Sequence, residues 1–161
     1  MSAKKRILFV DDEINVLQGL KRGLRGMKKE WDMEFASGGK EALDALGSLP
    51  IDAVVTDMQM PEVDGLHVLI GALERRPEAI RCVLSGQTKF DVILRAAPAT
   101  HLVLFKPCDT AAIEQRVRRV MDRNEALKDQ SLRKMVAHVA AIPCSPELAM
   151  QAAASDRKSV V

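Results

Sequence analysis

The sequence lacks the features of disulfide-linked, zinc-binding and membrane-spanning proteins. Its three cysteines, Cys82, Cys108 and Cys144, lie far apart and form no CxxC pair, so we expect neither a disulfide framework nor a zinc site. No apolar run approaches the roughly 20 residues that a membrane-spanning helix needs. The apolar stretch behind the basic start is also shorter than the ~7–15 apolar residues of a secretory signal. We therefore expect a cytoplasmic protein with no membrane segment.

The sequence also lacks a large excess of positive or negative charge. The 24 Lys and Arg residues nearly balance the 22 Asp and Glu residues, which leaves a net charge of +2. This balance argues against nucleic acid as a direct partner. A hydrophobic content of 47% with 29% charged residues is typical of a globular protein, and 161 residues suffice for one ordinary domain plus a short appendage.

What is present is a regular alternation of strand and helix patterns. Short apolar runs predict strands at residues 6–10, 33–36, 51–57, 80–86 and 101–107. Each run is followed by apolar residues at helical spacing, and Asp12 is available to cap the first helix. Five strand–helix repeats predict a doubly wound α/β fold, a parallel sheet with helices on both faces.

Polar side chains stand where four of these strands end. They are Asp11, Asp12, Asp57, Ser85 and Lys106. Because parallel strands deliver their carboxyl ends to one edge of the sheet, these side chains are expected to converge. Three carboxylates that meet would repel unless a cation is present, and hard oxygen ligands suit Mg²⁺. A carboxylate beside Mg²⁺ and an ammonium group is placed to attack a phosphoryl group and form an aspartyl phosphate. Any one of these residues, taken singly, is better explained as a strand-end cap or a surface charge, but chance does not readily place such residues at the ends of four strands.

As a set, these residues resemble the response-regulator receiver domain of two-component signalling. The resemblance rests on Asp11-Asp12, the block Asp57 to Gly65, Leu84-Ser85-Gly86 and Lys106-Pro107, and it covers about residues 4–125. It implies a flavodoxin-like (βα)5 fold and a switch controlled by phosphorylation, not an enzyme that turns over a substrate. The implied partners are a histidine kinase or histidine phosphotransfer protein, together with an output domain or downstream protein. The resemblance leaves open whether the protein forms a homodimer.

The resemblance also assigns roles to single residues. Asp57 is the implied phosphoacceptor, Ser85 the hydroxyl that turns toward the phosphoryl group, and Lys106 the cation of the site. The implied Mg²⁺ contacts are Asp12, Asp57 and the backbone carbonyl of Gln59, with Asp11 acting mainly through a metal-bound water.

One position departs from the family pattern. The family usually carries Tyr or Phe three residues before the lysine, and Val103 stands there. Phe105 shares the strand parity of Val103, so both are expected on the same face. Whether Phe105 replaces the missing aromatic stays open, and we interpret both residues as members of the core.

The composition shifts beyond the predicted domain, which we place at residues 1–125. Residues 126–161 are expected to form a helical tail, with an apolar stripe at Leu132, Met135, Val136 and Val139. Residues 132–159 resemble the opening of an HDOD output domain, through the proline-rich stretch 142–148.

Two other functions agree with parts of this pattern. A phosphohydrolase of the haloacid dehalogenase kind also forms an aspartyl phosphate with Mg²⁺. That family needs an acid two residues after its nucleophile, and here the place is Gln59. A degenerate receiver that serves only as a scaffold is disfavoured by the intact set of acids, serine and lysine.

Overall fold

The computed structural model describes residues 3–86 and 90–126 of the chain. The strands are β1 (Lys5–Val10), β2 (Trp31–Ala36), β3 (Ala53–Asp57), β4 (Ile80–Ser85) and β5 (Leu102–Phe105). The α-helices are α1 (Ile14–Gly23), α2 (Gly39–Ser48), α3 (Gly65–Arg75), α4 (Phe90–Ala96) and α5 (Thr110–Ala126). Two 3₁₀ segments are η1 (Arg25–Lys29) and η2 (Ala97–Ala99).

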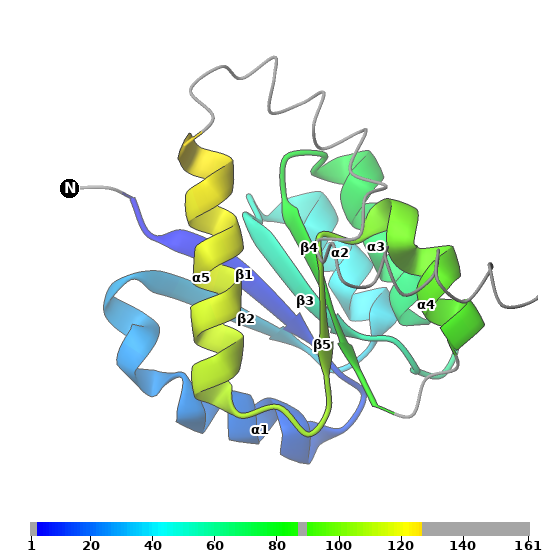
Figure 1. Ribbon diagram of the computed structural model, residues 1–161, viewed down its shortest axis with the longest axis horizontal. Coiled ribbons are helices and arrows are strands. Elements are labelled where there is room, and N and C mark those ends of the chain that lie inside the picture. Colours follow the sequence, from blue (N-terminus) through cyan, green and yellow to red (C-terminus); the bar gives the residue numbers. More distant parts are fainter. Residues whose placement is uncertain (1–2, 87–89, 127–161) are drawn as a thin grey trace, which may run out of the picture.

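The strands form one parallel sheet in the order β2-β1-β3-β4-β5. Figure 1 shows α1 and α5 on one side of this sheet and α2, α3 and α4 on the other. The order places β1 and β3 side by side in the middle, with the chain reversing its direction of winding between them. Ligand sites of such sheets lie at this switch point, outside the carboxyl ends of the strands. The predicted doubly wound five-stranded fold is confirmed.

Alternate residues of the central strands fill two hydrophobic layers, as a sheet buried on both faces requires. The layer under α1 and α5 contains Ile7, Phe9, Leu17, Leu20, Val55, Leu84, Leu104, Ile113 and Val117. The opposite layer contains Leu8, Val10, Leu46, Val54 and Val68 in one cluster and Met58, Leu69, Val83 and Ala96 in another. Packing in these two layers fixes the positions of the strand ends relative to one another.

Several predicted boundaries are wrong by one or two residues. The third strand begins at Ala53 and not at Ile51, because the backbone N–H of Ile51 is used in a turn with the carbonyl of Leu49. The fifth strand ends at Phe105, so Lys106 follows the strand and is not its last residue. The helix α4 ends at Ala96, and Pro98 follows inside the 3₁₀ segment η2.

Asp12 is not the cap of the first helix. The N-cap residue of α1 is Glu13, and no side chain makes a capping hydrogen bond there. The neighbouring Asp11 instead accepts a hydrogen bond from the backbone N–H of Glu13, at 2.9 Å from Oδ1. The carboxylate of Asp12 is therefore left for other contacts.

Among residues 3–86 and 90–126, no helix has the length and apolar character needed to cross a membrane. The predicted helical tail, residues 126–161, and its likeness to an HDOD domain lie outside the described residues apart from Ala126, which ends α5.

Candidate functional site

Asp57 is the last residue of β3, a strand that is buried along its whole length. The strand consists of Ala, Val, Val and Thr before it reaches Asp57, and such residues suit a strand covered on both faces. The carboxyl-terminal position carries the side chain out of the sheet at its edge, and only 7% of Asp57 is exposed. The backbone N–H of Met58 donates to Asp57 Oδ1 at 2.9 Å. One carboxylate oxygen is thereby held in place.

The start of α3 lies directly against this strand end. A Cβ on Gly65 would lie 2.2 Å from the backbone oxygen of Asp57 and 2.7 Å from the Cα of Met58, so no larger residue fits without a backbone shift. Asp64 caps the helix by accepting a hydrogen bond from the backbone N–H of His67. The Asp64-Gly65 pair therefore sets the loop that follows Asp57.

Two further carboxylates come from the adjacent strand. Asp11 and Asp12 follow β1, which pairs with β3, and one ligand atom from each of Asp11, Asp12 and Asp57 lies within 4.8 Å of the other two. Asp11 is buried, at 1% exposure, whereas Asp12 is exposed. Oxygen atoms grouped in this way are the ligands that hard divalent cations prefer. The predicted convergence of the three acids is confirmed.

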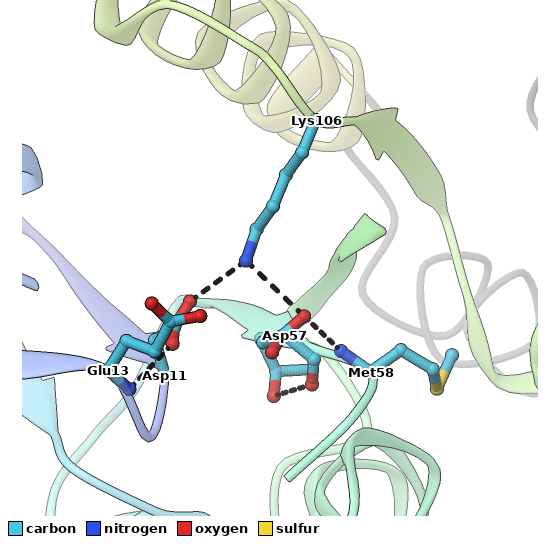
Figure 2. A network of polar contacts seen from close by, with 6 residues as sticks. Asp11, Glu13, Asp57, Met58 and Lys106 are labelled. Atoms are coloured by element: carbon cyan, nitrogen blue, oxygen red, sulfur yellow. Dashed lines mark hydrogen bonds and ion pairs between the residues drawn. The ribbon is translucent and has the colours of Figure 1, made fainter. Parts of the chain in front are cut away.

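Lys106 reaches the acids from the end of β5. Its Nζ lies 3.1 Å from Asp11 Oδ2 and 3.5 Å from Asp57 Oδ1. Figure 2 shows the ammonium group between the two carboxylates, one directly after β1 and one at the end of β3. Among the described residues, Lys106 is the only cation that forms an ion pair with this acidic cluster. One ammonium group thus faces three carboxylates.

The shared environment shifts two pKa values. Burial raises the pKa of the Asp57 carboxyl above its ordinary value; Lys106 opposes this rise and Asp11 adds to it. Burial alone would lower the pKa of Lys106, but the hydrogen bond to Asp11 and the charge of Asp57 outweigh it and raise that pKa. Lys106 is therefore a fixed positive charge at neutral pH, and the acids stay under-neutralised.

Ser85 ends β4, the other neighbour of β3. The residue is fully buried, and its Oγ has no hydrogen-bond partner among the described residues. A buried hydroxyl without a partner is uncommon, because its desolvation is not compensated. Gln59 lies two residues beyond Asp57 in the loop before α3 and is exposed. All five strand-end side chains thus lie at the carboxyl edge of the sheet.

The interpretation of Phe105 as a core residue is wrong. Its side chain is 52% exposed, while that of Val103 is partly buried. Because β5 is an edge strand and Phe105 is its last residue, fewer elements cover it than cover the central strands. Leu102 and Leu104 pack into the layer under α1 and α5, so strand alternation assigns Val103 and Phe105 to the opposite face.

Three contributors to the site were not identified from the sequence. The backbone N–H groups of Met58 and Glu13 hold Asp57 and Asp11, and Gly65 supplies the space beside the strand end. Backbone donors leave no signature in side-chain identity. The Asp-Gly pair before a helical pattern was a visible signal, but it indicated only a helix start.

Comparison with known proteins places this geometry in a family. The sequence model described as "Response regulator receiver domain" matches residues 7–118. Transcriptional regulatory protein PrrA of Mycobacterium leprae is 33% identical over 129 residues, which make up 78% of this chain and 54% of that relative. Regulatory protein AtoC of Escherichia coli is 31% identical over 145 residues, covering 86% of this chain and 29% of AtoC. The chain spans about half the length of the first relative and less of the second.

Solved structures agree with the fold. The signal receiver domain of an HD domain-containing protein from Pseudomonas fluorescens Pf-5 superposes with a TM-score of 0.71 at 25% identity, over 77% of this chain and 99% of that one. A CheY-like response regulator receiver domain protein from Methanospirillum hungatei JF-1 gives a TM-score of 0.72 at 22% identity, over 77% of this chain and 98% of that one.

Proposed function

The chain belongs to the response regulator receiver domain family, and from this premise we propose that it is a phosphorylation-dependent switch of a two-component system, with Asp57 as its phosphoacceptor. The observation that carries the proposal is the Asp57 carboxylate at the end of a buried strand, beside two acids and with Lys106 Nζ at 3.5 Å. In this proposal the protein turns over no separate substrate. Its only chemistry after phosphorylation is the slow loss of its own phosphoryl group.

The transfer step is an attack by a carboxylate oxygen of Asp57 on phosphorus. The P–O bond to Asp57 forms as the P–N bond of a donor phosphohistidine, protonated on its other ring nitrogen, breaks; the imidazole keeps the electron pair of that bond and its proton and leaves neutral. Met58 N–H and Lys106 engage Oδ1, so the other oxygen, Oδ2, is the nucleophile. Lys106 offsets the negative charge on the phosphoryl oxygens.

The acidic cluster fits Mg²⁺. Both oxygens of Asp11 already accept hydrogen bonds, from Glu13 N–H and from Lys106, whereas Asp12 is exposed. This contrast supports Asp12 as a direct ligand and Asp11 as a contact through water, and the family resemblance adds Asp57 and the backbone carbonyl of Gln59 as direct ligands. Bound Mg²⁺ supplies charge neutralisation to the phosphoryl oxygens.

The read-out begins at Ser85. Its buried Oγ lacks a partner among the described residues, so a new acceptor on the neighbouring strand attracts it. A turn of Ser85 toward the phosphoryl group moves the segment after β4, which leads to α4. The charge added at Asp57 thereby shifts a two-state equilibrium of the surface formed by α4, β5 and α5.

The partners follow from the same function. The donor is a histidine kinase or histidine phosphotransfer protein, and the switch works in the cytoplasm on an output domain or a downstream protein. Because residues 132–159 resemble the opening of an HDOD domain, the output domain in this proposal is of the HDOD type. The relatives named as regulatory proteins are longer than this chain, which supports an output region beyond the receiver domain.

Labelling with acetyl phosphate and Mg²⁺ tests the proposal. Intact-mass measurement should show one added phosphoryl group on the wild-type chain and none on Asp57→Asn. Asp44→Asn, which removes an exposed carboxylate on α2, is the matched control and should label normally. Undiminished labelling of Asp57→Asn would refute the assignment.

A further inference from the structure

The two edges of the sheet meet the solvent in different ways. At the β2 edge, Asp32 and Glu34 alternate along the strand. Their ion pairs join Lys4 to Asp32 at 3.8 Å, and Arg6 to Asp32 and Glu34 at 3.8 and 3.9 Å. Charged side chains on an edge strand are a usual defence against pairing with another chain. The edge at β2 is therefore protected by its own sequence.

The edge at β5 has no such protection. The strand reads Leu-Val-Leu-Phe, without a charge, and its last residue, Phe105, is 52% exposed. In α4, the helix that packs on the adjoining strand β4 through Val92 and Ala96, Phe90 is 56% exposed and Leu94 50%. Phe90 and Leu94 are one helical turn apart and share a side of α4. We name Phe90, Leu94 and Phe105 the apolar edge patch.

Most of the exposed large apolar side chains of the described residues belong to this patch. The other two, Ile14 and Ile70, lie singly on α1 and α3. Scattered apolar residues are ordinary on a protein surface, whereas a group of them beside an uncharged sheet edge indicates a surface that is covered.

The segment after α5 has the length and the pattern to provide the cover. α5 begins beyond the carboxyl end of β5 and runs for 17 residues, a length of roughly 25 Å in a helix. If the chain reverses its direction after Ala126, a helical segment of about the same length is sufficient to reach the patch. In the sequence of that segment, Leu132, Met135, Val136 and Val139 recur at helical spacing and form one stripe.

We propose that residues 132–139 of this same chain dock on the apolar edge patch and cover the β5 edge. Because the segment is attached to the domain through the preceding residues, its local concentration at the patch is higher than that of a separate molecule. The contact adjoins the phosphorylation site, because Phe105 immediately precedes Lys106 in the chain. Residues 132–139 are also the first residues of the proposed output region, so phosphorylation and output meet at this surface.

Hydrogen exchange of the full chain, read by mass spectrometry, tests the proposal from the side of the segment. Val136→Asp places a charge in the stripe and should remove an apolar contact with the patch. The weaker docking should speed hydrogen exchange in α4 and β5 about fivefold. Ala137→Asp, which adds the same charge on the other side of the helical pattern, should leave α4 and β5 unchanged. Exchange in β2 should not change in either variant.

The reciprocal variants test the patch. Leu94→Asp should speed exchange in residues 132–139 by a similar factor, and Ile70→Asp, at an exposed apolar residue of α3, should not. Both replaced side chains are exposed, so the domain is expected to stay folded, and circular dichroism checks it. Sedimentation of the wild-type chain at the same concentration should report a monomer. Unchanged exchange in α4 and β5 of Val136→Asp, or protection that appears only with a dimer, would overturn the proposal.

Discussion

Among residues 3–86 and 90–126, charged side chains are buried at two places, and their partners differ. At the carboxyl ends of the strands, Asp11 and Asp57 share the single ammonium group of Lys106, with Asp12 close by. Toward the other end of the sheet, Arg81 of β4 is fully buried. Its guanidinium group donates to the carbonyls of Ala99, Ala79 and Pro77, at 2.8, 3.1 and 3.3 Å.

The difference shows how a buried charge serves structure or chemistry. The donors of Arg81 meet fixed carbonyls of the segments before and after the strand, so the charge holds η2 and the α3–β4 loop to the sheet. At the other site the acids outnumber the cation, and a buried hydroxyl, Ser85 Oγ, has no partner among the described residues. A site with unpaired hydrogen-bond acceptors and donors can bind a ligand, whereas a buried charge whose hydrogen bonds are all made contributes to stability.

Replacement of Arg81 should have the largest effect on stability. Arg81→Met keeps much of the apolar volume but removes the donors of three carbonyls, each of which costs roughly 1–3 kcal/mol when left unpaired. With partial relaxation we expect the free energy of unfolding to fall by about 3 kcal/mol. Chemical denaturation measures the loss.

The Arg81→Met variant also tests whether the surroundings of Arg81 are independent of the acidic site. At a temperature where Arg81→Met is still folded, its labelling by acetyl phosphate should match the wild type. Loss of labelling in the folded variant would show that Arg81 belongs to the chemistry and would break the comparison.

His101, beside Arg81, should make stability depend on pH. Its Nδ1 accepts a hydrogen bond from the backbone N–H of Arg81, and burial with the nearby Arg81 charge lowers the pKa of the ring to about 4. Between about pH 6.5 and 4 the unfolded chain binds a proton that the folded chain does not, so stability falls as the pH falls. We expect a loss of about 2 kcal/mol from pH 7 to 4.5 from this residue.

Denaturation curves of the wild type and His101→Asn at several pH values isolate this contribution. Asparagine offers an acceptor oxygen in place of Nδ1 but does not titrate, so the variant should lose less stability on acidification. Parallel pH profiles for the two proteins would contradict the expectation.

The smallest effects should distinguish the acids of the site. Asp12 is exposed and unengaged by the described ion pairs, whereas both oxygens of Asp11 are held. Asp12→Ala should therefore weaken Mg²⁺ binding about tenfold, and Asp11→Ala by less. Amide chemical shifts near Asp12 and Gln59, followed during a Mg²⁺ titration, measure both. Equal losses would contradict the separate roles.

The sequence was informative where one physical signal dominated. Apolar runs that ended in Asp11, Asp57 and Ser85 predicted both the central strands and their shared edge, because parallel topology leaves few alternatives. The edge strand was harder. Parity placed Val103 and Phe105 on one face, but the exposure of Phe105 depends on which helices cover that face, and this is a property of the whole fold.

Arg81 shows a second limit. In the sequence it interrupts an apolar run, and arginine is seldom fully buried unless it is paired. Its role depends on backbone carbonyls from Pro77 to Ala99, which no pattern of side chains records. The segment η1 likewise follows α1 without a period of its own, and its buried residue, Met27, packs into the core.

The most direct test of the account is to locate the phosphoryl group within the chain. After labelling with acetyl phosphate and Mg²⁺, borohydride reduction converts an aspartyl phosphate into homoserine, and peptide mass mapping finds its position. The account predicts homoserine at position 57 alone. Modification at Asp11 or Asp12, or a phosphoryl group on a residue other than aspartate, would contradict it.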